Sequence, residues 1–296
     1  MLPATAMQAQ VVSSINNANL QKAPQPVKTK KSKSKAEASK AVIDTSTTYF
    51  RLIDTVQTCL DAKDWAGAET YLRKALQAEP TNPNNSLLIS NLATVQRHEG
   101  NTAGALKNYT LALDMTPNAV TVLTNRAALY LQLDSIGKAR ADYERIVKID
   151  PSVVEAHYNL GILDLNEGKT KEADQEFDEI LRWQPGAVLA SQGKALLNKI
   201  TGNYAKAVEY YSQVISEKPT ADLLANRADC YLTMRRLTEA SEDIGSALSI
   251  DPNDGYLYLL RAKLNKLRYE DADAERDVKL AVQHGVDPEY AQSALK

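Results

Sequence analysis

"AHYNLGILDLNEGKTKEADQEFDEILRWQP", residues 156–185, holds the pattern that decides the fold of this chain. Ala173 follows another small or polar residue and is itself followed, four positions later, by the bulky Phe177. Gly161 lies twelve residues before Ala173, and Pro185 lies twelve residues after it. This spacing predicts two helices that touch through small residues, with a bulky side chain beside the contact and a proline that ends the second helix.

The same pattern recurs along most of the chain. Alanines equivalent to Ala173 succeed one another at steps of 37, 34, 34, 34, 33 and 34 residues. They are Ala68, Ala105, Ala139, Ala173, Ala207, Ala240 and Ala274. The bulky residues four positions later are Leu72, Tyr109, Tyr143, Phe177, Tyr211, Ile244 and Val278. A single helical pair cannot bury its own apolar face, so seven such periods indicate pairs that stack on one another.

In period, register and signature positions, residues 156–185 resemble a tetratricopeptide repeat. The resemblance covers about 80% of the chain. It implies an all-α fold, a right-handed α-solenoid of seven helix-turn-helix hairpins with a short C-terminal capping helix. Within a solenoid at 46–296, the repeats are expected near 49–82, 86–119, 120–153, 154–187, 188–220, 221–254 and 255–286, and the cap at 287–296. Gly100, Gly168 and Gly202 are expected at the turns between helices, in the left-handed conformation.

Residues 1–45 have a different composition. They hold too little apolar content to form a core, so we expect a disordered Lys/Ser/Gln-rich segment. Seven lysines against Glu37 and Asp44 give this segment a net charge of +5; because the whole chain carries −2, residues 46–296 carry −7. The lysine-rich stretch 27–40 has no arginine and no interleaved aromatic residue, which favours a solvated tether. We therefore expect no nucleic-acid partner.

Two interpretations of residues 1–9 stay open. Ala4, Thr5 and Ala6 are small residues of the kind that a signal peptidase accepts. Residues 1–9 are then the end of a longer signal peptide, which predicts a periplasmic or exported protein. The alternative is a disordered N-terminus of a cytoplasmic protein. No apolar run reaches the roughly 18 residues of a transmembrane segment.

The sequence offers no arrangement of residues for catalysis, a metal or a cofactor, and we predict that the protein is not an enzyme. The histidines His98, His157 and His284 show no metal-ligand spacing with one another or with the two cysteines. Cys59 and Cys230 fall in first helices, where a small buried thiol is the common explanation. His157 is expected to be a packed or hydrogen-bonded histidine of the core.

The resemblance implies a concave groove lined by the first helix of each hairpin, chiefly through repeat positions 2, 5, 6, 9, 12 and 13. Position 6 carries an asparagine in four repeats, with a gap at Gly193: Asn91, Asn125, Asn159 and Asn226. One hypothesis is a ladder of amides that hydrogen-bond the main chain of an extended peptide. The alternative is that each amide bonds a neighbouring helix. Six further residues are expected to supply selectivity: Arg97, Thr121, Glu155, Tyr158, Asp222 and Tyr256.

The resemblance therefore implies a non-catalytic protein–protein interaction scaffold that binds an extended or helical protein segment in its groove, within a cell-envelope assembly if the chain is exported. The alternative is a structural, self-associating solenoid with no groove ligand. A chaperone-type carboxylate clamp is not expected, because all of its cations are missing. Around Asn125 and Asn226 the clamp positions hold Ser90, Thr94, Glu155, Asn159, Gln192, Leu196, Tyr256 and Leu260.

The middle of the array is predicted to be its least stable part. His157 and Ser191 replace apolar residues in the fourth and fifth repeats, and each repeat depends on contacts with its neighbours. Hydrogen exchange followed by mass spectrometry should show faster exchange in the fourth and fifth repeats than in the second and third. Equal protection in all four would contradict this prediction.

Overall fold

The structure is a computed structural model that describes residues 45–295. The predicted signal remnant at 1–9 and the rest of the N-terminal segment before Thr45 lie outside the described residues. Within residues 45–295 there are fifteen α-helices, one 3-10 helix and no strand. None of these helices is long and apolar enough to cross a membrane. The chain divides into two compact units, one up to Ala156 and one from His157 onward, which are called unit 1 and unit 2.

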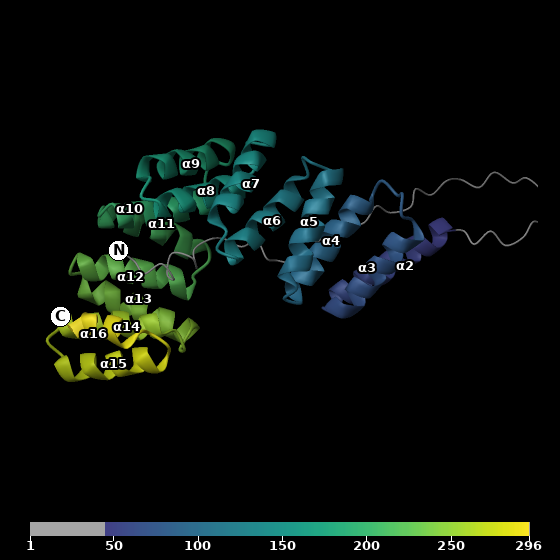
Figure 1. Cartoon of the computed structure of the whole chain (residues 1–296). Coiled ribbons are helices and arrows are strands. Elements are labelled where there is room, and N and C mark those ends of the chain that lie inside the picture. The colour runs from purple at the N-terminus through teal and green to yellow at the C-terminus, as the bar shows by residue number, and fades with distance from the viewer. Residues whose placement is uncertain (1–44, 296) are drawn as a thin grey trace, which may run out of the picture. The chain divides into compact units, whose positions relative to one another are not determined.

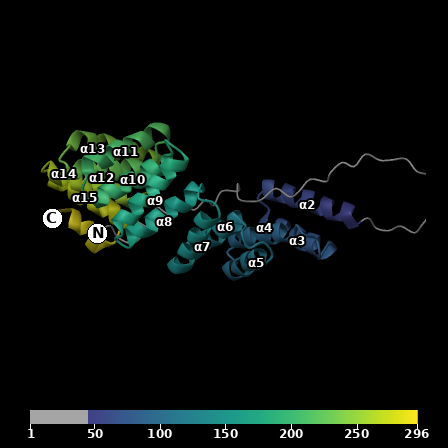
Figure 2. The same cartoon turned by 90° about the horizontal axis from the view of Figure 1, so that it is seen from above.

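Each unit is built from helical hairpins whose two helices lie side by side (Figure 1, Figure 2). Unit 1 contains α2 (Thr45–Asp61), α3 (Trp65–Ala78), α4 (Asn85–His98), α5 (Thr102–Met115), α6 (Val120–Gln132) and α7 (Ile136–Ile149). The unit boundary falls within α8 (Val154–Asn166). Unit 2 continues with α9 (Thr170–Trp183), α10 (Val188–Ile200), α11 (Tyr204–Glu217), α12 (Ala221–Thr233), α13 (Leu237–Ile250), α14 (Gly255–Leu267), α15 (Asp271–Gln283), α16 (Pro288–Gln292) and η2 (Ser293–Leu295). The predicted all-α fold of seven hairpins is confirmed.

The turn inside each hairpin has one left-handed residue at the same repeat position. Gly100, Gly168 and Gly202 adopt it with φ angles of 79°, 75° and 81°, as predicted. In the other four hairpins the left-handed residue carries a Cβ, although that conformation costs least at glycine. These residues are Lys63, Asp134, Arg235 and Tyr269, with φ between 53° and 62°. The turn geometry therefore follows from the repeat and does not require glycine.

The predicted packing of bulky on small residues is present. The seven bulky residues of the pattern are all buried, from 0% exposed for Phe177 to 6% for Val278. A Cβ placed on Gly161 of α8 would lie 2.4 Å from Cε1 of Phe177, and a Cβ placed on Gly193 of α10 would lie equally close. The ring thus fills space that glycine leaves on its own hairpin and on the next repeat. This contact also explains why the asparagine row is interrupted at Gly193.

A two-pronged ion pair joins the two helices of three hairpins. Nε and Nη2 of Arg126 donate hydrogen bonds to the carboxylate of Asp142 at 2.8 and 2.7 Å. The same geometry, with the partners again sixteen residues apart, links Arg227 to Asp243 and Arg261 to Asp277. The three aspartates are buried, and their hydrogen bonds raise the pKa of each arginine. Parallel hydrogen bonds between two planar groups fix the spacing of the helices that carry them.

Two expectations about single residues are confirmed. His157 is buried, and its Nδ1 lies 2.6 Å from Oε2 of Glu176 on α9, so it is a hydrogen-bonded core histidine. Cys59 and Cys230 are free, buried thiols. Burial raises the pKa of the Cys230 thiol to about 12, which keeps it protonated near neutral pH.

The C-terminal segment covers the last hairpin, as predicted. Asp287 caps α16 by accepting a hydrogen bond from the backbone N–H of Tyr290, and Pro288 occupies the first turn. Ala291 and Ala294 of this segment pack against Leu259 of α14 and Val278 of α15 in one apolar cluster. The cap therefore closes the apolar face that an eighth hairpin would otherwise bury.

Substitutions at glycine test the contact with Phe177. Gly193→Ala should lower the free energy of unfolding by about 1–3 kcal/mol, because the added methyl group overlaps the ring. Gly245→Ala is the matched control: it lies in the interior of α13 with open space around it and should stabilise the protein by about 0.5–1 kcal/mol. Urea unfolding measures both. Equal effects of the two substitutions would show that the Phe177 contact does not limit the approach of the helices.

Candidate peptide-binding surface

The side of each first helix that carries repeat positions 2, 5, 6, 9, 12 and 13 is called the first-helix face. All ten residues predicted to bind a ligand lie in first helices. In unit 1 they are Asn91 and Arg97 on α4, Thr121 and Asn125 on α6, and Glu155 on α8. In unit 2 they are Tyr158 and Asn159 on α8, Asp222 and Asn226 on α12, and Tyr256 on α14. Their binding of a ligand stays a prediction.

In unit 1, Arg97 connects the second repeat to the third. Its Nε donates a hydrogen bond to Oε1 of Gln132 on α6 at 3.1 Å. Its Nη2 is buried and has no hydrogen-bond partner among residues 45–295. Burial lowers the pKa of the guanidinium, and the hydroxyls of Tyr109 and Tyr143 act against that shift. The charged group is thus partly desolvated without a carboxylate to compensate it.

Two tyrosines from second helices reach the surroundings of Arg97. The hydroxyls of Tyr109 and Thr94 lie 2.9 Å apart and hydrogen-bond each other. The hydroxyl of Tyr143 is buried and has no hydrogen-bond partner within the described part of the chain. Burial raises the pKa of Tyr143, and the carboxylate of Glu155 raises it further. Both phenols therefore stay protonated at physiological pH.

The asparagines of unit 1 occupy the same repeat position on successive first helices. Asn91 and Asn125 are each 4% exposed, and the neighbouring Thr121 and Glu155 are half-buried. The placement agrees with the register that the repeat predicts, and whether these amides hold a peptide stays a prediction.

In unit 2, Lys199 connects the fifth repeat to the sixth. Its Nζ donates to Oδ1 of Asn226 at 2.9 Å and to Oδ2 of Asp229 at 2.8 Å, both on the first helix of the following repeat. The Asn226 amide in turn donates to the backbone carbonyl of Asp222 at 2.9 Å. At this position the asparagine therefore bonds a neighbouring helix, which is what the alternative to the ladder hypothesis predicts.

The remaining predicted residues of unit 2 differ in accessibility. Tyr158 is 1% exposed, with its ring 6.1 Å from that of Phe177, and Asn159 is fully buried. Asp222 is exposed. Burial raises the pKa of Tyr256, and the nearby carboxylate of Asp229 adds to the shift. Asp222 and Tyr256 thus give this end of the face an acidic and aromatic character.

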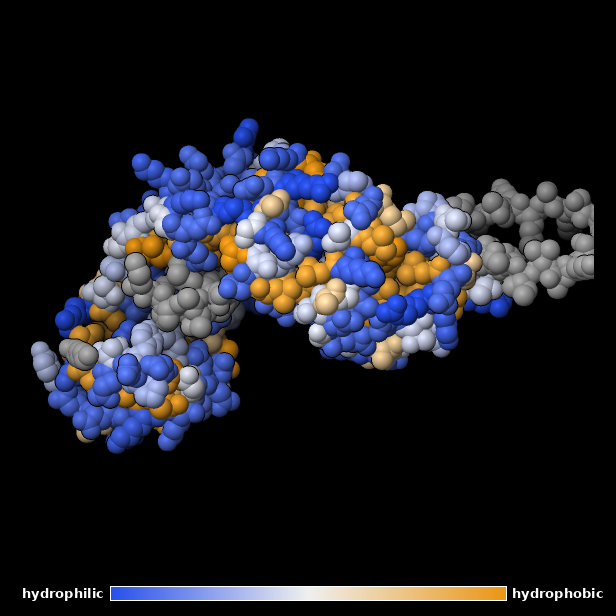
Figure 3. Space-filling model, viewed as in Figure 1, coloured by the Kyte–Doolittle hydropathy of each residue, from blue (hydrophilic) through white to orange (hydrophobic). Residues whose placement is uncertain are grey.

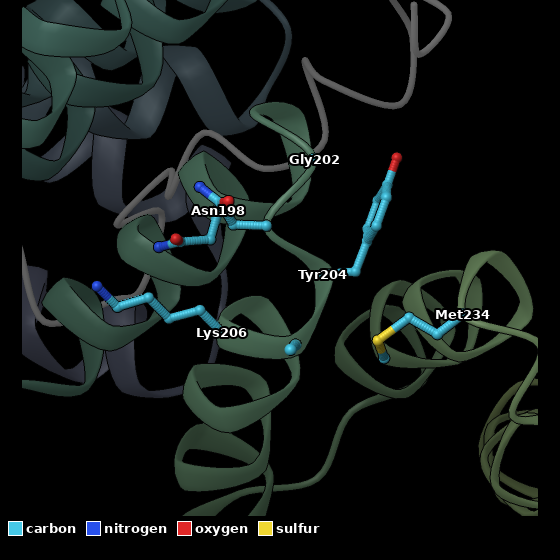
Figure 4. Close-up of a pocket in the computed structure, with 7 residues that line it drawn as sticks. Asn198, Gly202, Tyr204, Lys206 and Met234 are labelled. Carbon is cyan, nitrogen blue, oxygen red and sulfur yellow. The ribbon is translucent and has the colours of Figure 1, made fainter.

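A separate pocket of about 550 Å³ lies at the turn of the fifth repeat and the end of α12 (Figure 4). In Figure 4, Lys206 extends away from Tyr204 and Met234. The lining residues are Asn198, Gly202, Asn203, Tyr204, Ala205, Lys206 and Met234. None of the ten predicted residues is among them. Within residues 45–295, no group of three or more His, Cys, Asp or Glu side chains could hold a metal ion.

Apolar side chains are also exposed outside the first-helix face. On the side shown in Figure 3, apolar and charged surfaces alternate over unit 1. Leu111 and Met115 of α5 are 43% and 44% exposed. Trp183 and Ile250, at the ends of α9 and α13, are 48% and 52% exposed. Apolar surface of this scattered kind is normal for soluble proteins and does not mark a site by itself.

Comparison with known proteins relates the chain to one family. Sequence models of the tetratricopeptide repeat match residues 201–264, and a second model of that repeat matches 90–154 and 124–188. A solved tetratricopeptide repeat protein from Parabacteroides merdae is 35% identical, with a TM-score of 0.69. The match covers 84% of this chain and 98% of that one. No curated protein sequence matches the chain.

Two more distant structures share the fold. Pseudomonas aeruginosa pilF is 19% identical, with a TM-score of 0.62, and the match covers 74% of this chain and 99% of that one. PilW, described as a widely conserved type IV pilus biogenesis factor, is also 19% identical, with a TM-score of 0.59 and coverage of 71% and 96%. At this level of identity the likeness extends to the fold alone.

Arg97 and Lys199 occupy the same repeat position, but replacing them should lower the free energy of unfolding by different amounts. Lys199→Met should lower the free energy of unfolding by about 1–3 kcal/mol, because Asp229 loses its partner in a partly buried site. Arg97→Met should change it by less than about 1 kcal/mol, since one hydrogen bond is lost and a desolvated charge is removed. Chemical unfolding of the two variants checks this. A larger loss for Arg97→Met than for Lys199→Met would contradict it.

Proposed function

The chain belongs to the tetratricopeptide repeat family, and on that premise we propose that it is a non-catalytic scaffold that binds a protein segment along the first-helix face of its repeats. Proteins of this fold serve as interaction scaffolds, and the partner is another protein or peptide. The family gives the class of function, while a few side chains on the first-helix face select the partner.

The observation that supports this proposal most directly concerns two equivalent tyrosines. Tyr143 in unit 1 and Tyr211 in unit 2 lie at the bulky position of their repeats, and both hydroxyls are buried without a hydrogen-bond partner in the described part of the chain. Besides burial, the pKa of Tyr143 is influenced by Glu155 and Arg97 of first helices and by Asp142 of α7. The groups that act on Tyr211 all belong to first helices: Cys230, Tyr158, Asp229 and Tyr256. A buried hydroxyl without a partner costs about 1–3 kcal/mol. Because both hydroxyls are buried, a peptide on the first-helix face would supply the missing partners only if the side chains that cover them move on binding.

Photo-crosslinking at single positions tests the proposal. A photoreactive amino acid is placed at Thr121 or Asp222 on first helices, and at the exposed Glu144 or Glu209 on second helices as matched controls. Crosslinking in the native cells should give adducts at the first two positions that map to one segment of one partner, and none at the controls. Adducts to another copy of this chain, with concentration-dependent sedimentation, would favour the self-associating alternative. Equal adducts at all four positions would contradict the proposal.

The crosslinked segment, made as a synthetic peptide, then tests the asparagine ladder. Asn125→Ala combined with Asn159→Ala should weaken its binding by about 1–3 kcal/mol, at roughly 0.5–1.5 kcal/mol for each lost hydrogen bond. Because both asparagines are buried, the double variant should also lose stability, so peptide binding is measured at a temperature at which it is fully folded. Asn226→Ala is the control, because its amide accepts from Lys199 and its loss should lower stability. Lower stability of the double variant with unchanged peptide binding would show that these amides support the solenoid.

A place in a cell-envelope assembly remains part of the proposal. It rests on the small residues at 1–9, which lie outside the described part of the chain.

A further inference from the structure

The turns inside the last three hairpins lie side by side along one edge of unit 2. The pocket of about 550 Å³ joins the turn of the fifth repeat to Met234, the residue that follows α12. In the turn of the seventh repeat, Nη2 of Arg268 donates a hydrogen bond at 3.3 Å to the backbone carbonyl of Leu237, the first residue of α13. Residues 201–206, 234–237 and 266–271 therefore form one surface, which is called the turn edge.

Cations gather on the turn edge although unit 2 as a whole is acidic. Residues 157–296 hold 17 lysines and arginines against 23 aspartates and glutamates, a net charge of −6. The turn edge has the opposite balance, with five cations and two acids: Lys206, Arg235, Arg236, Lys266 and Arg268 against Glu270 and Asp271. The turns of the first three repeats, residues 62–65, 99–102 and 133–136, hold one lysine against three acids. Positive charge is thus a property of this edge and does not follow from the hairpin turn itself.

Part of this charge is available to a partner. Two ion pairs, at 2.6 and 2.7 Å, neutralise two of the cations: Arg236 with Glu239, and Lys266 with Asp271. Lys206, Arg235 and Arg268 have no carboxylate partner within residues 45–295. Lys206 and Arg235 are exposed, so each can bind a carboxylate from outside without losing an internal bond.

Apolar surface accompanies these cations. Tyr204 and Met234 are half-buried and stand on one side of the pocket, whereas Asn198 and Lys206 lie on its other side (Figure 4). Tyr269, in the turn of the seventh repeat, is 91% exposed. The turn edge therefore combines a recess that has an apolar wall with unpaired cations beside it.

We propose that the turn edge binds an acidic segment of a partner protein, separately from the first-helix face. Carboxylates of the segment pair with Lys206, which lines the pocket, and with Arg235, which follows Met234 in its wall. An apolar side chain of the segment enters the pocket beside Tyr204 and Met234. Binding at this edge requires no ligand on the first-helix face, so either surface can be shown to be inactive without the other.

Charge and shape favour a protein segment over an anionic bilayer. Cations placed beside an apolar recess complement a segment in which acidic residues flank an apolar one. A bilayer surface is broad, so it would meet the projecting Tyr269 but would not enter the recess between the turns. The ion pairs already made by Arg236 and Lys266 also lower the positive charge that a bilayer would sense.

Peptide selection with the full chain tests the inference. Random peptides displayed on phage are selected on the wild-type protein and counter-selected on the double variant Lys206→Ala with Arg235→Ala. The counter-selection removes peptides that bind elsewhere, including those on the first-helix face. The peptides that remain should carry more aspartate and glutamate than the starting library, with an apolar residue among the acids.

Synthetic versions of these peptides then locate the surface. Lys206→Ala with Arg235→Ala should weaken their binding about 3- to 30-fold, and the difference should shrink at high salt, because exposed ion pairs are weak and screened. Met234→Ala removes part of the apolar wall and should weaken binding about 3- to 10-fold. The matched control is Lys218→Ala with Lys279→Ala, which removes the same charge from exposed positions of unit 2 outside the turn edge and should leave binding unchanged.

Several results would overturn the inference. They are a selection that yields no peptide, peptides without an excess of acids, and an equal loss of binding in the control variant. Flotation of the wild type, but not of the Lys206→Ala with Arg235→Ala variant, with vesicles of phosphatidylserine and phosphatidylcholine would, in the absence of selected peptides, assign the edge to a bilayer. Concentration-dependent sedimentation that this variant abolishes would, again without selected peptides, assign it to a second copy of the chain. Crosslinking at Thr121 and Asp222 tests the first-helix face independently of all these results.

Discussion

The contact between one bulky side chain and the small residues of two first helices holds this structure together. Phe177 meets Gly161 of its own hairpin and Gly193 of the next repeat, and a methyl group on either glycine would overlap the ring. The same side chain thus closes one hairpin and attaches it to the following one. Because interiors are close-packed, the size of these residues sets how near the helices can come. The other repeats carry a side chain where Gly193 stands, so the part that the sequence pattern repeats is the contact within each hairpin.

Polar side chains also link the helices, through hydrogen bonds beside the apolar contacts. The arginine–aspartate pairs lie within hairpins, whereas Arg97 and Lys199 connect the first helices of successive repeats. Buried ion pairs contribute more to a defined geometry than to net stability, since desolvation offsets much of their attraction. Asn226 shows that a residue in the row predicted for a ligand also serves the array, because Lys199 donates to its amide. The row proposed for recognition therefore also serves the structure.

Periodicity was sufficient to predict the fold. Small and bulky residues at fixed distances, prolines after the second helices and glycines at turns all reflect local sterics, which a single sequence records. The left-handed turns at Lys63, Asp134, Arg235 and Tyr269 follow from the same register once the glycine turns are aligned. The register also placed the ten predicted residues on first helices. It could not give their partners, because the bond between Lys199 and Asn226 depends on side-chain conformations in two repeats. Among residues 45–295 the arginine–aspartate pairs occur in three repeats only. Opposite charges sixteen residues apart were the pattern that would have revealed them.

The glycine at position 193 also has a consequence for what the array can recognise. Wherever position 6 bears an amide, a bound segment can offer a backbone N–H or carbonyl to it. At the fifth repeat the Phe177 ring occupies the space beside the backbone, and no side chain projects from Gly193. A segment held by its main chain would find no amide there. A residue of the segment that lacks a backbone N–H would therefore lose no hydrogen bond at that point. A ligand of this scaffold could thus carry a proline opposite the fifth repeat, and bend there, without weakening its attachment on either side.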